Sequence, residues 1–237
     1  MSDATLFVFR DDPYAQSCTA TVVRADERGI VLDRSVFYPT GGGQPGDSGT
    51  LNHGGGTIAI VEARKGETPE SVLHIPAPGA ALPAPGTQVT AALDWERRHR
   101  HMRVHTCLHL LSAVLPYAVT GGQVSNGKGR LDFDIPEATL DKDKIAADLN
   151  RLIQDNHAVA AEWITDAELA ANPEMVKTMS VKPPAGSGRV RLIRVAGCDL
   201  QACGGTHVRA TGEIGPVQVI KIEKKGRLNR RVAIQLA

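Results

Sequence analysis

The first part of the chain alternates apolar and polar residues in short runs, the pattern of β-strands with one buried face. Turns rich in glycine, proline and charged residues separate these runs. Strands are predicted at residues 5–10, 17–24, 29–33, 57–63 and 88–93. Such regular spacing favours a small barrel or sandwich. We expect a β-barrel domain over residues 1–92, in which the proline-rich stretch at 76–86 precedes the last strand.

After residue 93 the apolar pattern takes a helical period. Apolar residues recur three or four positions apart, and Pro116 ends the run. These apolar positions are Val104, Leu108, Leu111 and Leu115. A neighbouring stripe of the same helix holds three histidines, His101, His105 and His109. The sequence therefore predicts a helix with a core face and, beside it, a face of imidazoles.

The remaining residues mix helical and strand patterns. Helices are predicted at about 140–160 and 167–170, and strands at 130–135, 190–195, 217–222 and 231–236. We expect residues 93–237 to form a two-layer α+β domain with helices packed on an antiparallel sheet. The predicted fold class is therefore α+β, with a small amino-terminal β-barrel domain followed by this second domain.

Two pairs of metal-binding side chains stand out in the second domain. His105 and His109 lie one helical turn apart on one face. Cys203 and His207 have the same spacing, and the two glycines between them let the backbone turn so that both can face one ion. Three imidazoles and a thiolate are a typical ligand set for tetrahedral zinc. We predict one zinc ion per chain at these four residues, with His101 as an alternative ligand.

The role of such a zinc ion stays open at this point. Four protein ligands complete a tetrahedral site, whereas catalytic zinc usually keeps one position for water. Either one ligand leaves, or the coordination expands, or the metal mainly holds shape and orients substrate. The HExxH motif of metalloproteases is absent, because Thr106, Cys107 and Leu108 fill the gap between the histidines. The HxE…PCxxC pattern of zinc deaminases is absent as well.

Composition limits the function classes further. The formal net charge is +1 and only 4% of residues are aromatic, so any nucleic-acid contact should be local and not built on base stacking. Four cysteines in 237 residues do not suggest a disulfide framework and favour a reducing compartment. The sequence has no signal-peptide pattern at its start and no apolar stretch of the roughly 18 residues that a membrane span needs. We expect a cytoplasmic protein without a membrane partner.

Several motifs together resemble a known family. They are HTCLHLL at residues 105–111, GQVS at 122–125, RLDFD at 130–134, CGGTHV at 203–208 and GGGQPGD at 41–47. The first four resemble the editing domain of alanyl-tRNA synthetase. With the glycine-rich motif, the whole chain resembles the free-standing alanyl-tRNA editing proteins of the AlaX family, in their medium-length form.

This resemblance implies hydrolysis of the ester that joins serine or glycine wrongly to tRNA(Ala). It assigns the zinc ligands to the same four residues, and it implies that the loop of Gly41, Gly42 and Gly43 borders the amino-acid pocket. Without the resemblance, that loop is equally well a turn between strands. The synthetase form often has threonine where this chain has Leu108. Gln123, our candidate for orienting the ester, is therefore also a candidate to read the serine hydroxyl, as are Thr106 and Ser125. No synthetase core accompanies these domains, so we expect no ATP binding.

The predicted tRNA contacts are two basic clusters. One lies at the start of the first helix, where we expect the side chains of Arg97, Arg98, Arg100 and Arg103 to point outward. The other lies near the end of the chain and comprises Lys221, Lys224, Lys225, Arg227, Arg230 and Arg231. Phosphate contacts would make binding depend steeply on salt, whereas a solvated surface would not.

Two other functions remain open. One is a zinc-stabilised tRNA-binding module without hydrolase activity. The other is a zinc-dependent hydrolase of a small ester or amide, which would turn over substrates that lack tRNA.

Overall fold

The computed structural model describes residues 4–135, 139–176 and 188–237. The chain divides into two compact units, Met1–His99 and Arg100–Ala237. The boundary falls inside helix α2 (Trp95–Val114), whereas the sequence placed it before this helix, after residue 92. None of the described helices combines the length and apolar character that a membrane-crossing helix requires.

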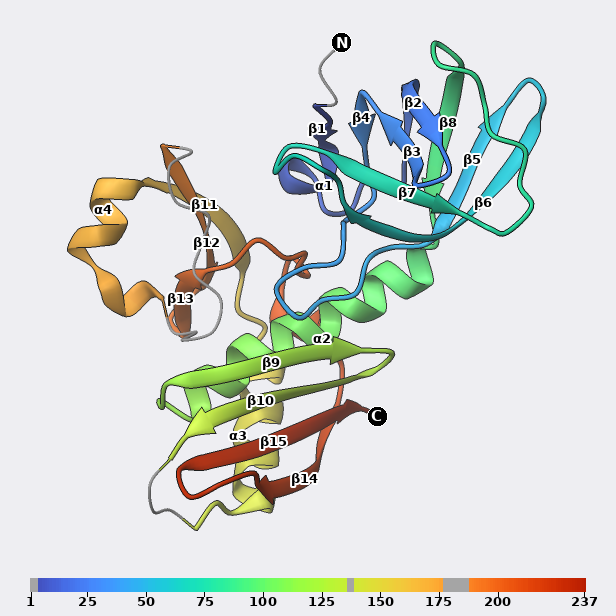
Figure 1. Cartoon of the computed structure of the whole chain (residues 1–237). Helices are drawn as coiled ribbons and strands as arrows, with labels where there is room; N and C mark the ends of the chain where they lie inside the picture. Colours follow the sequence, from blue (N-terminus) through green and yellow to red (C-terminus); the bar gives the residue numbers. More distant parts are fainter. Residues whose placement is uncertain (1–3, 136–138, 177–187) are drawn as a thin grey trace. The chain divides into compact units, whose positions relative to one another are not determined.

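The first unit is built around a closed antiparallel barrel with strand order β2-β3-β7-β6-β5-β8 (Figure 1). Its strands are β2 (Ser17–Asp26), β3 (Gly29–Leu32), β5 (Gly49–His53), β6 (Gly56–Lys65), β7 (Val72–Pro76) and β8 (Gln88–Leu93). Inward side chains such as Leu32, Leu51 and Ile60 are buried, each stabilising the unit by roughly 1.5–3 kcal/mol. The predicted amino-terminal barrel is confirmed, although sequence reasoning missed β5 and β7.

The predicted strand at residues 5–10 is largely wrong. Only β1 (Leu6–Phe7) is extended, pairing in parallel with β4 (Arg34–Ser35), and the chain then enters the short helix α1 (Val8–Asp11). The helical turn buries Phe9 against Tyr38, with the two rings edge to face at 5.6 Å. A short apolar run fits either structure, so tertiary packing decides it.

The second unit contains a four-stranded antiparallel sheet with order β14-β15-β10-β9. These strands are β9 (Val119–Ser125), β10 (Lys128–Asp134), β14 (Val217–Lys224) and β15 (Asn229–Leu236). Gly129 of β10 allows α2 to approach the sheet closely, because a Cβ there would lie 2.7 Å from Val104 Cγ1 and 3.2 Å from Leu108 Cδ2. The core face predicted for this helix therefore packs on β10.

Helix α3 (Lys142–Gln154) packs on the same sheet, against β14 (Figure 1). It starts at Asp141, whose carboxylate caps the backbone N–H groups of Asp143 and Lys144. It buries one stripe of aliphatic side chains, Ile145, Leu149 and Ile153. The helix ends earlier than the predicted residue 160, because Asn156 adopts a left-handed conformation with φ of 52°.

A second antiparallel sheet completes this unit, with order β11-β12-β13. Its strands are β11 (Val159–Thr165), β12 (Arg189–Val195) and β13 (Asp199–Ala202). The short helices α4 (Asp166–Ala171), η1 (Pro173–Met175) and η2 (Thr211–Ile214) lie in the connections. The predicted α+β class is confirmed, but the unit contains two antiparallel sheets where one was expected. Strand β13, which precedes the CGGTH segment, was not predicted.

Candidate metal centre

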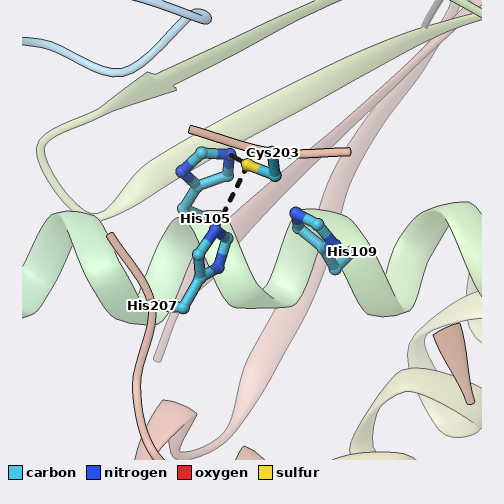
Figure 2. A group of neighbouring side chains, drawn as sticks. All are labelled: His105, His109, Cys203 and His207. Atoms are coloured by element: carbon cyan, nitrogen blue, oxygen red, sulfur yellow. Dashed lines mark hydrogen bonds between the residues drawn. The ribbon is translucent and has the colours of Figure 1, made fainter. Parts of the chain in front are cut away.

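The four predicted metal ligands lie together in the second unit. His105 and His109 project from α2, and Cys203 and His207 come from the segment after β13 (Figure 2). The potential ligand atoms of all four lie within 4.8 Å of one another. Cys203 Sγ is 3.6 Å from His105 Nε2 and 3.3 Å from His207 Nε2. Two segments almost a hundred residues apart thus converge on one point.

This spacing fits a tetrahedral metal ion. With bonds of roughly 2.0–2.3 Å, such an ion separates its ligands by roughly 3.3–3.8 Å. The two sulfur–nitrogen distances given above lie in this range, and all the ligand atoms lie within 4.8 Å of one another. The three histidines are buried and Cys203 is half-buried. Among the described residues, the group that could hold a metal contains these four and not His101, the alternative ligand.

The surroundings of Cys203 and His207 favour the deprotonated, metal-binding forms of these two side chains. Burial opposes ionisation of the Cys203 thiol, but the nearby imidazoles of His105 and His207 outweigh it and hold the thiol pKa well below its ordinary value. Burial, followed by the charge of His105, lowers the pKa of His207 well below its usual range. A thiolate beside a neutral imidazole is what zinc requires, because its ligands must be deprotonated.

Thr106 lies behind the ligand His207, and its predicted role in reading the serine hydroxyl stays a prediction. Its side chain is fully buried, and its hydroxyl donates a hydrogen bond to the carbonyl of Met102 at 2.9 Å. The hydroxyl oxygen accepts from the backbone N–H of Val208 at 3.2 Å and lies 3.3 Å from His207 Nδ1. Because the hydroxyl proton goes to Met102, His207 Nδ1 is the donor in this contact and its Nε2 is left to face the cluster. Thr106 therefore positions a ligand.

Arg191 of β12 fixes the turn that carries Cys203. The buried guanidinium donates from Nη1 to the carbonyls of Cys203 at 3.0 Å and Gly205 at 2.9 Å. The backbone N–H of Cys203 in turn donates to the carbonyl of Arg191 at 3.1 Å. One planar donor group therefore constrains both ends of the Cys-Gly-Gly segment.

Gln123 and Ser125 lie on the opposite face of the sheet from α2. Their neighbour Val124 is buried and pairs with Gly129, the position that α2 approaches, whereas Gln123 and Ser125 are exposed. The side-chain oxygen of Gln123 accepts from Arg130 Nε at 3.1 Å, and Ser125 donates to the carbonyl of Lys128 at 3.0 Å. The predicted role of Gln123 in orienting the ester and that of Ser125 in reading the serine hydroxyl stay predictions.

The glycine-rich loop belongs to the first unit and forms a tight turn. Gly41 and Gln44 form a two-way backbone hydrogen-bonded bridge, and Gly42 and Gly43 between them have φ values of 55° and 80°. Glycine adopts two such left-handed conformations in succession without strain, because it has no Cβ. Their predicted contact with an amino-acid pocket stays a prediction.

The predicted outward cluster of arginines is corrected at Arg98. This residue is fully buried and binds the equally buried Asp47, with further hydrogen bonds to the carbonyls of Pro13 at 2.9 Å and Val36 at 2.6 Å. It holds the start of α2 to the barrel unit and is not available to a phosphate. The helical periodicity of the sequence could not show that the face of α2 that carries Arg98 is buried.

The other predicted basic residues are more accessible. Arg97 contacts the carbonyl of Gly46, Arg100 donates to Asn126, and Arg103 donates to the carbonyl of Ile214; all three arginines are half-buried. At the β14–β15 turn the exposed basic side chains are Lys224, Lys225 and Arg227, beside the half-buried Arg230. Their contact with tRNA remains a prediction.

Sequence reasoning missed the polar residues behind the ligands. The Asp199 carboxylate accepts a hydrogen bond from His109 Nδ1 at 2.9 Å, and this contact together with the Cys203 thiolate outweighs burial and raises the pKa of His109 to about 9. Gln201 and Ser112 join the same network. In the sequence, an acidic residue four positions before the cysteine is only a weak signal of a contact with a ligand. The strand that positions its side chain is short and spans only Asp199–Ala202.

Two models of known protein families match parts of this chain. The model of "tRNA synthetases class II (A)" matches residues 4–97, and that of the "Threonyl and Alanyl tRNA synthetase second additional domain" matches residues 190–233, which include Cys203 and His207. The barrel unit and the unit with the cluster of three histidines and a cysteine therefore both resemble parts of aminoacyl-tRNA synthetases.

Curated relatives define the family more closely. Alanyl-tRNA editing protein AlaX-M of Methanosarcina acetivorans is 33% identical over 95% of this chain and 96% of the relative. AlaX-M of Methanosarcina mazei is 33% identical over 100% of this chain and 97% of the relative. The alanine–tRNA ligase of Pyrococcus furiosus is 33% identical over 93% of this chain, but only 24% of that ligase is covered. The chain belongs to the family of alanyl-tRNA editing proteins.

Proposed function

We propose that the chain is an aminoacyl-tRNA deacylase that hydrolyses the ester of serine, and of glycine, wrongly attached to tRNA(Ala). The observation that carries this proposal is the cluster of His105, His109, Cys203 and His207 in a member of the alanyl-tRNA editing family. The similarity to alanyl-tRNA editing proteins supports tRNA as the partner.

The chemistry requires modest assistance, because an aminoacyl ester is already activated. The main needs are a positioned water and donors for the charge that develops on the carbonyl oxygen. Zinc bound by the four side chains would supply a Lewis acid close to the ester. The protein holds this ligand set through Thr106 behind His207 and through Arg191 at the turn of Cys203. A rigid set of ligands supports an orienting role for the metal at least as well as water activation.

Selectivity must come from polar contacts. Serine differs from alanine by one hydroxyl group, and a purely hydrophobic pocket discriminates poorly between such substrates. A pocket that pairs the serine hydroxyl with a buried polar group discriminates strongly, because alanine leaves that group without its partner. We therefore propose serine as the better substrate. We also propose that the glycine-rich turn at Gly41, Gly42 and Gly43 borders the pocket, as the family resemblance implies.

The test is deacylation of tRNA(Ala) charged with serine, glycine or alanine by the purified protein. We expect serine to be released fastest and alanine slowest. The Cys203→Ala variant should lose the activity, whereas Cys198→Ala, a matched change at a half-buried cysteine just before β13, should retain it.

Three results would contradict the proposal. Equal rates for serine- and alanine-charged tRNA would exclude an editing role. Binding of tRNA without any hydrolysis would indicate a zinc-stabilised binding module. Turnover of a serine alkyl ester as fast as the charged tRNA would indicate a general hydrolase.

A further inference from the structure

A closed ring of buried hydrogen bonds lies behind the ligand His109. The Asp199 carboxylate accepts from His109 Nδ1 at 2.9 Å and from Gln201 Nε2 at 2.6 Å. Gln201 Nε2 also donates to Ser112 Oγ at 3.0 Å, and Ser112 donates to the backbone carbonyl of His109 at 2.8 Å. The ring thus returns to the residue where it began, and it ties α2 to β13.

Every side chain in this ring is shielded from water. Asp199 and Gln201 are each 7% exposed, Ser112 is 3% exposed and His109 is 4% exposed. A buried carboxylate is costly unless hydrogen bonds and nearby positive charge compensate it. If this position served packing alone, an apolar residue of similar size would stabilise the fold at least as well. The charged carboxylate of Asp199 at this buried position therefore indicates that it acts on the group it contacts, the imidazole of His109.

The geometry of the contact defines that function. A carboxylate that accepts from Nδ1 keeps a proton on this nitrogen, so Nε2 is the nitrogen left to bind the metal. The negative charge also makes Nε2 more basic and hence a stronger metal donor. His207 has the neutral hydroxyl of Thr106 as its corresponding partner. His109 therefore has a charged hydrogen-bonding partner, whereas His207 has a neutral one.

We propose that Asp199 is a positioning residue of the metal centre, which fixes the tautomer and ring orientation of His109 and strengthens its bond to zinc. Gln201 and Ser112 hold the carboxylate in place. This inference rests on the zinc site of the proposed function and adds to it a determinant of metal affinity outside the four ligands.

The Asp199→Asn variant separates charge from shape. An amide oxygen still accepts the hydrogen bond of His109, so the ring orientation is kept while the charge is lost. We expect zinc affinity about 10-fold weaker for Asp199→Asn and about 100-fold weaker for Asp199→Ala, the range typical of outer partners of metal-bound histidines. The matched control is Asp148→Asn, which removes a carboxylate that pairs with Lys144 on the surface of α3.

The measurement is zinc affinity by competition with a chromophoric chelator, together with the visible absorption of the cobalt-substituted proteins. Circular dichroism establishes that each variant is folded, and Asp199→Asn, which is isosteric, is the variant that decides. The inference is upheld by weaker zinc binding and a shifted cobalt spectrum in Asp199→Asn, with Asp148→Asn like the wild type. It is overturned if folded Asp199→Asn binds zinc as tightly as the wild type with the same spectrum. A wild-type protein that binds no zinc would overturn the metal site itself, and the role of Asp199 with it.

Discussion

Burial and hydrogen-bonding partners together decide the charge of the buried histidines. His74 lies in the barrel core, where its Nδ1 is 2.9 Å from the carbonyl of Ile30 and its Nε2 is 2.7 Å from Ser35 Oγ. A carbonyl only accepts, so Nδ1 carries the proton and Nε2 accepts from the serine. Burial lowers the pKa of His74 to about 4, whereas Asp199 helps to raise that of His109 to about 9. The same residue type is thus neutral in one unit and prone to protonation in the other.

The buried state of His74 predicts a loss of stability in mild acid. Its pKa in the folded state lies below its unfolded value of 6.5, so the unfolded chain takes up the proton first as the pH falls. The contribution of His74 is fully present above about pH 6.5. It declines by about 1.4 kcal/mol per pH unit down to about pH 4.

The direct measurement is an NMR titration of the His74 ring protons. We expect no change in their chemical shifts between pH 8 and pH 5. A midpoint near 6.5 would contradict the account. In urea unfolding, His74→Gln should reduce the loss of stability between pH 6.5 and 5, and His53→Gln, at a half-exposed position, serves as the matched control.

At the scale of elements, helix α2 contributes to both units and shows what periodicity can and cannot predict. Its apolar stripe and the ligands His105 and His109 follow from the sequence, because a long periodic pattern is a strong signal. Arg98 breaks the expectation that arginines at a helix start point outward. Its partner Asp47 is 51 residues away in the sequence, and no local pattern connects them.

Replacing Arg98 should destabilise the first unit strongly. Arg98→Met leaves the buried Asp47 without its cation, and breaking a buried ion pair typically costs about 3–5 kcal/mol. Arg97→Met, at the half-buried neighbouring position, should cost less than about 1 kcal/mol. The comparison requires thermal or urea denaturation of the two variants. Similar stability of both would refute the proposed role of Arg98.

The elements that the sequence did not predict are short or depend on their surroundings. Strands β5, β7 and β13 have four or five residues, too few for a clear alternation. The predicted second helix ran past Gln154 because its apolar residues continue, whereas the left-handed Asn156 ends it. Asp199 escaped notice for a similar reason, since its role appears only when β13 lies against α2. The four ligands were predictable because their spacing and chemistry are local to two motifs.

At the scale of the whole molecule, function depends on two motifs that meet only after folding. His105 and His109 come from one helix, and Cys203 and His207 come from a turn that Arg191 and Thr106 help to fix. The near-zero net charge leaves tRNA contact to local basic groups, of which Lys224, Lys225 and Arg227 are exposed at one hairpin. The proposed function therefore depends on metal binding and not on the overall charge of the protein.

The most direct test is to follow deacylation while zinc is returned to the metal-free protein. The substrate is tRNA(Ala) charged with serine, and bound zinc is measured in the same samples. We predict that activity is absent after chelation and rises in proportion to bound zinc until one ion per chain is reached. The account would be contradicted by a metal-free protein that deacylates this substrate as fast as the zinc-loaded protein.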